Sequence, residues 1–455
     1  MSMEKAIAHG RAHQTQAVES LKELVRIPSI STYSEHAADM HRAADWIAER
    51  LRALGMRAKI YPAIKHPVVY AESYEAGPSA PTVLVYGHYD VQPAEPLEEW
   101  TSPPFEPTQR GDYLFGRGTS DMKGQLIAQL AAVEAVRATG KLPVNLKYLL
   151  EGEEEVGSPN IRAFLLEHRD LVKCDVVLNV DSMILTPDLP SVVYGLRGLA
   201  YFEVRVFGPK QDLHSGLFGG PIHNPAQVLC DLVAGMHDAD GRVTLPGFYD
   251  SVRPLTADER AALARVPTTD EDIKRQTGVT QLRGEAGYTT VEQLGARPTL
   301  EVNGLLSGFT GEGSKTVLPA RSMAKISMRL VPDQTPEAVQ AQLEEYLRRK
   351  APPTVRWEVQ NLAGAPPAIV RRDTHEMGAA IRALKETFGV DPVFVREGGT
   401  IAVVGILQEL TGHESILMGF GLPDDNLHSP NERLFLPNFY RGIESYIRFL
   451  YALVR

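Results

Sequence analysis

Residues 82–93 read TVLVYGHYDVQP, and this stretch indicates the fold. Its apolar start is typical of a buried β-strand, and His88 and Asp90 follow where that strand would end. Side chains two residues apart on a strand point to the same side. We therefore expect these two side chains to converge at the carboxyl end of a strand. They either hold a metal ion or mark the point where a core strand reaches solvent.

Two further apolar segments, residues 144–150 and 175–180, are also predicted to be strands. Apolar residues recur with helical spacing between the first two strands, and again in residues 14–26 and 39–54. Strands that alternate with helices are typical of an α/β layered sheet. The first part of the chain is therefore predicted to be an α/β domain.

The sequence pattern changes after residue 195. Residues 199–208 and 322–332 alternate like half-buried strands, and a polar region rich in Pro and Gly lies between them, roughly at 240–300. Residues 335–350 have the pattern of a charged amphipathic helix, and a last amphipathic helix is expected near 438–453. The middle third thus resembles a separate α+β domain.

The chain of 455 residues is too long for one hydrophobic core. The simplest arrangement is a domain built from both ends of the chain with a second domain inserted. We expect residues 1–195 and 366–455 to form the first domain, and residues 196–365 to form the second.

The composition excludes several classes of function. The formal net charge is -10 and no basic cluster interrupts it, so nucleic acids and anionic membranes are not expected partners. No apolar run approaches the ~20 residues of a membrane span, and residues 1–16 lack the apolar core of a signal peptide. The two cysteines, Cys174 and Cys230, make neither a disulfide framework nor a zinc ribbon. We expect a cytoplasmic protein.

Acidic and imidazole side chains follow each of the three predicted strands. The second strand leads into EGEEEVGS and the third into Asp181, while Asp121 precedes a predicted helix and His428 lies in LPDDNLHSPNE. Singly, each has an ordinary alternative as a helix cap, a solvated acidic face or a loop residue. Ligands bind at the carboxyl ends of strands in open α/β sheets, and so many acids are costly to cluster without a cation. Together they indicate a hydrolytic Zn²⁺ or Mn²⁺ site.

Seven motifs carry a more specific resemblance. They are GHYDVQP, GRGTSDMKG, LEGEEEVGS, NVDS, DLHSGLFGG, REGGT and the late His428, in this order. The set resembles the co-catalytic di-zinc metallopeptidase family of carnosinase, cytosolic nonspecific dipeptidase, acetylornithine deacetylase and succinyl-diaminopimelate desuccinylase. YGLRG, SKTVLP and MRLVP make the match densest with the dipeptidase branch, from about residue 20 to the C-terminus. The resemblance implies an α/β zinc-peptidase-type catalytic domain, with a mixed central sheet flanked by helices, and an inserted α+β domain for lid and dimerisation functions.

The resemblance also implies a ligand set for two divalent ions, with Zn²⁺ expected first and Mn²⁺ as the alternative. His88 and Asp181 would bind one ion, and Glu155 and His428 the other. Asp121 would bridge both ions, and the peptide bond after it is typically cis in this family.

Three further residues receive catalytic roles from the resemblance. Glu154 would be the general base that activates a metal-bridging water, and Asp90 would orient the His88 ring. His214 would reach the active site of a partner subunit and stabilise the oxyanion, which implies a homodimer. The other glutamates of the EGEEE run, Glu151 and Glu153, are expected to take no part.

The expected substrate is a dipeptide or short peptide. By resemblance Arg329, Gly399 and Thr400 would bind its carboxylate, and Thr316 is a further expected substrate-binding residue; the dipeptidase branch usually has Ser where Thr400 stands. Glu397 would pair with a free amino group, an acid that the deacylase branch tends to lack. The alternatives are an N-acyl-amino-acid amidohydrolase and, from another class, a non-catalytic metal-binding protein.

Overall fold

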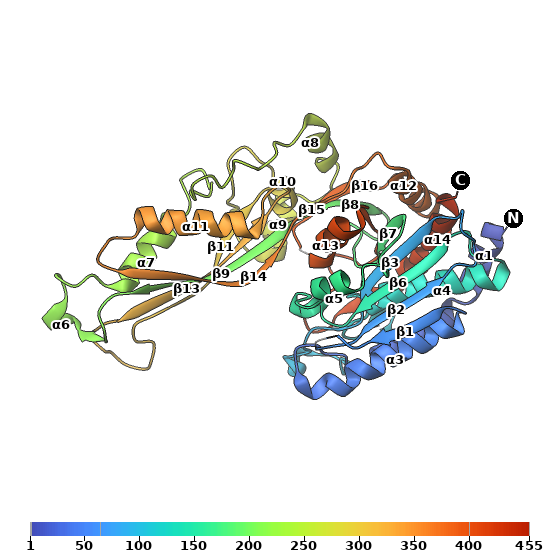
Figure 1. The fold of residues 1–455 in the computed structure, drawn as a ribbon, viewed down its shortest axis with the longest axis horizontal. Helices are drawn as coiled ribbons and strands as arrows, with labels where there is room; N and C mark the ends of the chain where they lie inside the picture. Colours follow the sequence, from blue (N-terminus) through green and yellow to red (C-terminus); the bar gives the residue numbers. More distant parts are fainter. Residues whose placement is uncertain (1, 64, 400, 455) are drawn as a thin grey trace. The chain divides into compact units, whose positions relative to one another are not determined.

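The computed structural model describes residues 2–63, 65–399 and 401–454 (Figure 1). The chain divides into two compact units, which we call unit 1 and unit 2. Unit 1 contains the described residues of 1–194, 370–395 and 403–455, and unit 2 those of 195–369 and 396–402.

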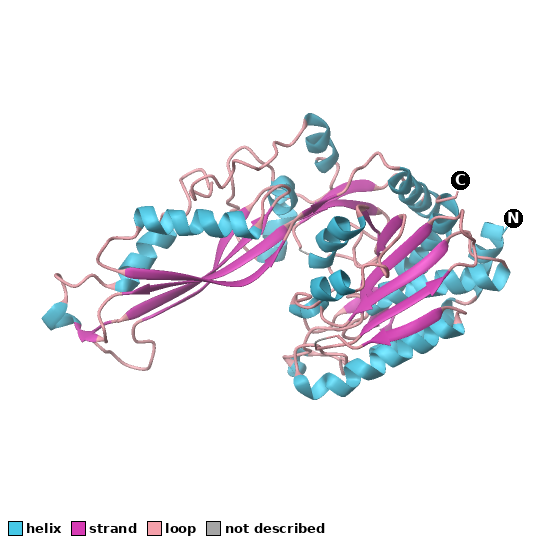
Figure 2. Ribbon diagram, viewed as in Figure 1, coloured by secondary structure: helices cyan, strands magenta, loops and turns pink. Residues whose placement is uncertain are grey.

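Unit 1 is built around a mixed β-sheet flanked by helices (Figure 2). Strand β3 is parallel to both of its neighbours, β6 and β7, and β17 is parallel to β7, whereas β1 and β2 are antiparallel. This confirms the mixed α/β fold class that was predicted. The strands in spatial order are β1 (Arg57–Tyr61), β2 (Val68–Ser73), β6 (Asn145–Glu151), β3 (Thr82–His88), β7 (Val176–Asn179), β17 (Ser415–Leu417) and β8 (Ser191–Leu196), with β16 (Val393–Glu397) also paired to β8. The two-residue strand β15 (Ala368–Ile369) belongs to unit 2.

The helices of unit 1 form layers against this sheet. Helix α4 packs against α1, α2 and α14, while α3 packs against β1 and β2. Most of α4 is buried on every side, because other helices cover the part that faces away from the sheet. The helices are α1 (Ser2–Ala12), α2 (Gln14–Val25), α3 (Ala37–Ala53), α4 (Lys123–Thr139), α5 (Ile161–Glu167), α12 (His375–Phe388), α13 (Ala402–Thr411) and α14 (Leu436–Ala452), with short 3₁₀ helices η1 (Ser34–His36), η2 (Leu97–Glu99) and η3 (Glu154–Val156).

A small antiparallel sheet in unit 1 joins distant parts of the chain. It has the order β18 (Arg433–Phe435), β5 (Tyr113–Phe115) and β4 (Thr108–Arg110). Because β18 pairs with β5, the segment that contains His428 lies beside the loop that contains Asp121.

Unit 2 is an antiparallel four-stranded sheet covered by helices on one face. The strand order is β11 (Thr299–Ser307), β13 (Arg321–Leu330), β9 (Gly198–Phe207) and β14 (Arg356–Ala365). Helices α7 (Pro225–Ala234) and α11 (Pro336–Lys350) pack on this sheet. Phe202 and Ile326 belong to the core between them, as the alternation of apolar residues along these strands predicted, and Leu343 of α11 packs in the same core.

The polar region rich in Pro and Gly, roughly 240–300, contains three helices that the sequence pattern did not indicate. They are α8 (Ala257–Leu263), α9 (Asp270–Thr277) and α10 (Thr290–Ala296). Each begins with a capping box, in which a Thr at the N-cap and an acid three residues later satisfy each other's backbone N–H groups. Unit 2 also contains the short elements β10 (Leu213–His214), α6 (Ser215–Phe218) and β12 (Val317–Leu318).

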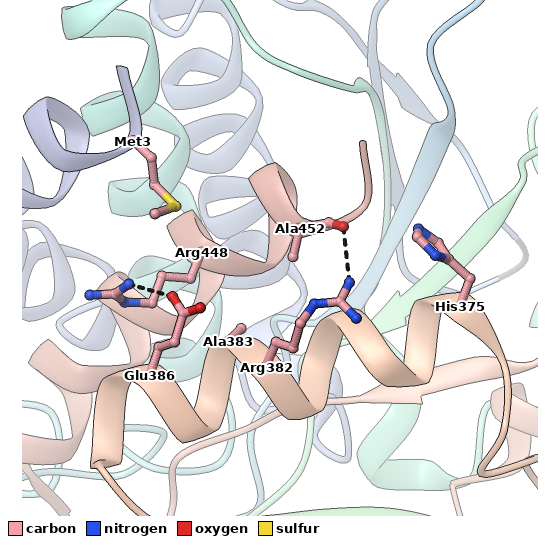
Figure 3. A pocket seen from close by; sticks show the side chains of 7 residues that line it. All are labelled: Met3, His375, Arg382, Ala383, Glu386, Arg448 and Ala452. Atoms are coloured by element: carbon pink, nitrogen blue, oxygen red, sulfur yellow. Dashed lines mark hydrogen bonds and ion pairs between the residues drawn. The ribbon is translucent and has the colours of Figure 1, made fainter. Parts of the chain in front are cut away.

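A cavity of about 340 Å³ lies in unit 1 between α12 and α14 (Figure 3). Its cationic side chains already have partners, since Arg448 pairs with Glu386 and Arg382 donates to the Ala452 carbonyl. No predicted site residue lines it, and the functional site is elsewhere. Among the described residues, no helix combines the length and apolar character that a membrane crossing requires.

Candidate metal centre

Three neighbouring strands bring predicted site residues to one edge of the sheet in unit 1. β3 ends at His88, β7 ends two residues before Asp181, and β6 ends three residues before Glu154. His88 is paired with Glu151 across the parallel β3–β6 ladder. The carboxyl ends of these strands therefore lie side by side, where α/β sheets bind ligands.

His88, Asp121 and Asp181 form the first potential metal-ligand group. Their ligand atoms lie within 4.8 Å of one another. His88 Nε2 lies 3.4 Å from Asp121 Oδ1 and 3.8 Å from Asp181 Oδ2. The buried Nε2 atom has no hydrogen-bond partner among the described residues. A buried, unpartnered ring nitrogen facing two carboxylates is the arrangement expected of a metal ligand.

Asp121, Glu155 and His428 form the second group, again with ligand atoms within 4.8 Å of one another. His428 Nε2 lies 3.0 Å from Asp121 Oδ2 and 3.3 Å from Glu155 Oε2. Asp121 therefore belongs to both groups and presents one carboxylate oxygen to each. This is the geometry of a carboxylate that bridges two cations.

The carboxylates of the two groups also need positive charge nearby to stay ionised. Burial raises the pKa of Asp181 to about 7; His88 opposes this shift, and Asp121 and Glu155 add to it. Burial likewise raises the pKa of Glu155, and the Asp121 carboxylate raises it further. Carboxylates crowded in a buried place stay ionised only beside cations. The His and carboxylate donors without cysteine fit Zn²⁺ and Mn²⁺.

Asp90 connects the two loops that carry these ligands. Its carboxylate is fully buried and accepts hydrogen bonds from the backbone N–H groups of Glu154, at 3.2 Å, and Glu155, at 3.0 Å. His88 Nδ1 lies 3.1 Å from the Asp90 carbonyl oxygen and 3.4 Å from its carboxylate. Asp90 thus contacts the His88 ring and also holds the backbone of the acidic run.

Glu154 lies beside the two groups without belonging to either of them. Burial raises the pKa of its carboxyl group well above the usual value; the His88 charge opposes this, and Asp181 and Glu155 add to it. A carboxylate with a raised pKa is a better proton acceptor at neutral pH, which suits a general base.

Two supporting residues were not singled out in the sequence, although both lie inside quoted motifs. Gln92 donates to Glu155 Oε2 at 2.9 Å, and Asn179 Oδ1 accepts from the Asp181 backbone N–H at 2.7 Å. In the sequence, these two residues could have been identified as amide side chains close to predicted ligand positions. Both interactions restrict the orientation of a ligand-bearing segment.

The other glutamates of the acidic run have structural contacts. Glu151 accepts hydrogen bonds from Tyr86 Oη at 2.7 Å and Ser158 Oγ at 3.0 Å. Glu153 accepts from the backbone N–H of His66 at 2.8 Å. These contacts direct both side chains to partners outside the two ligand groups.

The predicted residues His214 and Thr316 lie close together in unit 2, His214 on β10 and Thr316 directly before β12. His214 pairs with Val317 in the β10–β12 ladder, and the Thr316 carbonyl accepts from the Ser215 N–H at 3.0 Å. The exposed His214 side chain accepts a hydrogen bond from the Gly216 N–H at its Nδ1 atom, 3.0 Å away.

The remaining predicted substrate residues also belong to unit 2. Arg329 is half-buried on β13, and burial lowers its pKa. Arg197 supports the segment of Glu397 and Gly399: its backbone N–H donates to the Glu397 carbonyl at 3.2 Å and its Nε to the Gly398 carbonyl at 3.3 Å. Thr400 lies outside the described residues.

Potential ligand groups of this kind at the ends of parallel strands are typical of metallohydrolases. The model of "Peptidase family M20/M25/M40" matches residues 84–452, and the chain belongs to this family. It is a metal-dependent hydrolase of peptide bonds, as the order of motifs implied. The Asp121–Met122 peptide bond is cis, which the resemblance also implied.

The relatives cover nearly the whole chain. The human beta-Ala-His dipeptidase is 31% identical over 465 residues, which are 98% of this chain and 92% of the relative. A Cys-Gly metallodipeptidase of Schizosaccharomyces pombe is 31% identical over 469 residues, 100% of this chain and 98% of the relative. The solved structure of a metallo-carboxypeptidase from Sulfolobus solfataricus is 32% identical with a TM-score of 0.87, covering 96% of this chain and 99% of its own.

Proposed function

We propose that this protein cleaves dipeptides and other short peptides in a reaction that requires two divalent ions. The observation that carries the proposal is the position of Asp121, with one carboxylate oxygen facing each ligand group. The human and Schizosaccharomyces pombe proteins that this chain resembles are both named as dipeptidases, which supports the choice of substrate.

The two ligand groups would hold the two ions. His88 and Asp181 serve one ion, Glu155 and His428 the other, and Asp121 serves both. Two ions bound there polarise the scissile carbonyl and lower the pKa of a water molecule. Zn²⁺ is the expected metal because it favours His and carboxylate donors in hydrolytic sites, and Mn²⁺ is the alternative.

Glu154 is the general base of the proposed reaction. It accepts a proton from the attacking water and delivers it to the amine that leaves. Asp90 holds the Glu154 backbone in place, because the Asp90 carboxylate accepts hydrogen bonds from the N–H groups of Glu154 and Glu155. Asp90 therefore acts on the base and on a ligand at once, in addition to its contact with His88.

Substrate recognition involves residues of unit 2. The Arg329 guanidinium, with Gly399 and Thr400, would bind the substrate carboxylate, since Arg can grip a carboxylate with two hydrogen bonds. Thr316 completes this set. Glu397 would pair with the protonated α-amino group, which an N-acylated substrate lacks.

His214 would stabilise the oxyanion in the active site of a partner subunit. Its exposed position on unit 2 is compatible with a contact to another chain. The protein would therefore act as a homodimer. We further propose that it functions in the cytoplasm, because two isolated free cysteines are typical of a protein from a reducing compartment.

The two alternatives are less well supported. An N-acyl-amino-acid amidohydrolase has no need for an acid at Glu397, and the relatives named above are peptidases. A non-catalytic metal-binding protein would have no use for Glu154 beside two complete ligand groups.

The test compares one dipeptide with its N-acetylated form. The protein is treated with a chelator, and Zn²⁺ or Mn²⁺ is then added back. Metal-dependent cleavage of the free dipeptide alone is the expected result. Removal of the acetyl group instead would support the amidohydrolase alternative, and inactivity toward both by protein with two bound metals would contradict the proposed dipeptidase.

A further inference from the structure

Glu432 is a fully buried carboxylate with four hydrogen-bond donors around it. Its Oε2 accepts from Arg117 Nη1 at 2.7 Å and from the Gly118 N–H at 3.0 Å. Its Oε1 accepts from the backbone N–H groups of Ser120, at 3.0 Å, and Asp121, at 3.1 Å. Three of these four donors thus belong to the backbone of the loop that ends at the shared ligand.

A second buried carboxylate of the same C-terminal segment holds the same loop. Asp425 Oδ2 accepts from Ser120 Oγ at 2.6 Å and from the Leu422 N–H at 2.8 Å. The Glu432 carbonyl accepts from the Gly116 N–H at 2.9 Å. The segment that carries His428 is therefore joined, on both sides of that residue, to the loop that ends at Asp121.

Arg117 extends this connection to a third ligand-bearing segment. Its side chain is 1% exposed, and its Nη2 donates to the Pro93 carbonyl at 3.0 Å. Pro93 lies in the loop that follows His88 at the end of β3. The buried charges of Arg117 and Glu432 neutralise each other, and every donor that faces Glu432 is matched by an acceptor oxygen. Glu432 has no place among the metal ligands, so its contacts serve geometry.

The Asp121 carboxylate must present one oxygen to each ligand group. A side chain in such a role must be held to within about 0.5 Å of its working position. We propose that Glu432 is a positioning residue of the metal centre, which fixes the backbone of Gly118–Asp121 and so sets the Asp121 carboxylate between the two groups. The inference rests on the proposed two-metal function and adds to it a residue that touches neither metal nor substrate.

The test measures metal affinity in the Glu432→Gln variant. Gln has the same shape, but its NH₂ group must face two of the four donors and cannot accept from them. We expect Zn²⁺ and Mn²⁺ to bind about 10- to 100-fold more weakly, as for other residues that orient metal ligands. Affinity is measured by titrating the metal-free protein against a competing chelating dye, with circular dichroism to confirm that the variant is folded.

Asp424→Asn is the matched control. Asp424 lies in the same segment, is exposed, and pairs with Arg433 at 2.8 Å. The Asp424→Asn substitution removes the same negative charge, but Asp424 does not contact the loop of Asp121, so wild-type metal affinity is expected. At saturating Mn²⁺ the Glu432→Gln variant should also recover turnover with an unchanged KM, because its substrate contacts are intact.

The outcomes separate this inference from the proposed function. Wild-type protein that binds no metal would overturn the two-metal proposal and the role of Glu432 with it. Wild-type protein with two metals, beside a folded Glu432→Gln variant of equal affinity, would overturn the role of Glu432 alone. If that variant does not fold, Glu432→Asp replaces it, since this change keeps the charge but retracts the carboxylate by one methylene. Weakened binding in Glu432→Asp supports the inference, and wild-type binding overturns it.

Discussion

His428 Nε2 lies 3.0 Å from Asp121 Oδ2, although 307 residues separate the two along the chain. The pairing of β18 with β5 brings their segments together. In this arrangement hydrogen bonds with Asp121, and then with Glu155, raise the pKa of His428 to about 10. The metal-free site therefore holds a protonated His428 ring at neutral pH, and that ring must lose a proton to bind a metal.

Metal binding should accordingly release protons and strengthen as the pH rises. Each proton released makes the affinity increase about tenfold per pH unit below the pKa of the group that loses it. Calorimetric titration with Zn²⁺ in two buffers of different ionisation enthalpy gives the number of protons released at pH 7. Release of at least one proton is expected, and a pH-independent affinity with no release would contradict the assignment of His428 as a ligand.

Glu154→Gln should abolish most turnover and leave metal binding intact. The amide cannot accept the proton from water, and a positioned general base typically contributes 10²- to 10⁴-fold, so a loss of about that size is expected. Turnover of a dipeptide and metal content by mass spectrometry are measured on the same sample. A variant that retained wild-type turnover would remove Glu154 from the mechanism, whereas loss of a metal would assign it as a ligand.

His214→Ala should keep both metals and lose most turnover, because its proposed role is with the oxyanion. The trans role is tested by mixing this variant with Glu154→Gln and allowing subunits to exchange. A mixed dimer has one complete site, with Glu154 from one chain and His214 from the other, so activity should return. Activity that stays absent after confirmed exchange would contradict the contribution of His214 from a partner.

Glu151→Gln should change how stability depends on pH. Burial raises the pKa of Glu151 to about 7 from the ordinary 4.5, so the fold binds its proton more tightly than the unfolded chain does. This contribution to stability is present below about pH 4.5 and is lost as the pH rises through about 7. Gln cannot ionise and keeps an acceptor for Tyr86 and Ser158. The variant should be more stable than wild type at pH 8, by on the order of 3 kcal/mol, and similar near pH 5.

Urea unfolding of the metal-free proteins at pH 5, 6, 7 and 8 measures this difference. A difference between the two proteins that is the same at every pH would show that Glu151 does not titrate in this range.

The strands were accessible from the sequence because they follow local rules, and the candidate metal ligands came from the resemblance of the motifs to a known family. The apolar run that ends at His88 forms β3, and the segments ending near Glu151 and before Asp181 form β6 and β7 as predicted. Parallel strands place their carboxyl ends together, so residues that follow them in sequence meet in space. The order of motifs then added His428, which no local periodicity connects to the sheet.

Other features depend on contacts that a single sequence does not display. Glu432 looks like a surface charge in a polar loop, and only the fold shows that it is buried against the Asp121 loop. The helices α8, α9 and α10 were missed because Pro and Gly outweighed their short patterns, although Thr256, Thr269 and Thr289, each with an acid three residues later, were a readable signal.

The most direct test of the central claim is the number of metal ions bound per chain, measured by native mass spectrometry after loading with Zn²⁺. We predict two ions in the wild-type protein and one in Asp181→Asn, because that variant damages a single group. Asp121→Asn should weaken both sites, because its side chain faces both groups. A single ion in the wild-type protein, or two ions bound with wild-type affinity in Asp121→Asn, would contradict the shared role of Asp121.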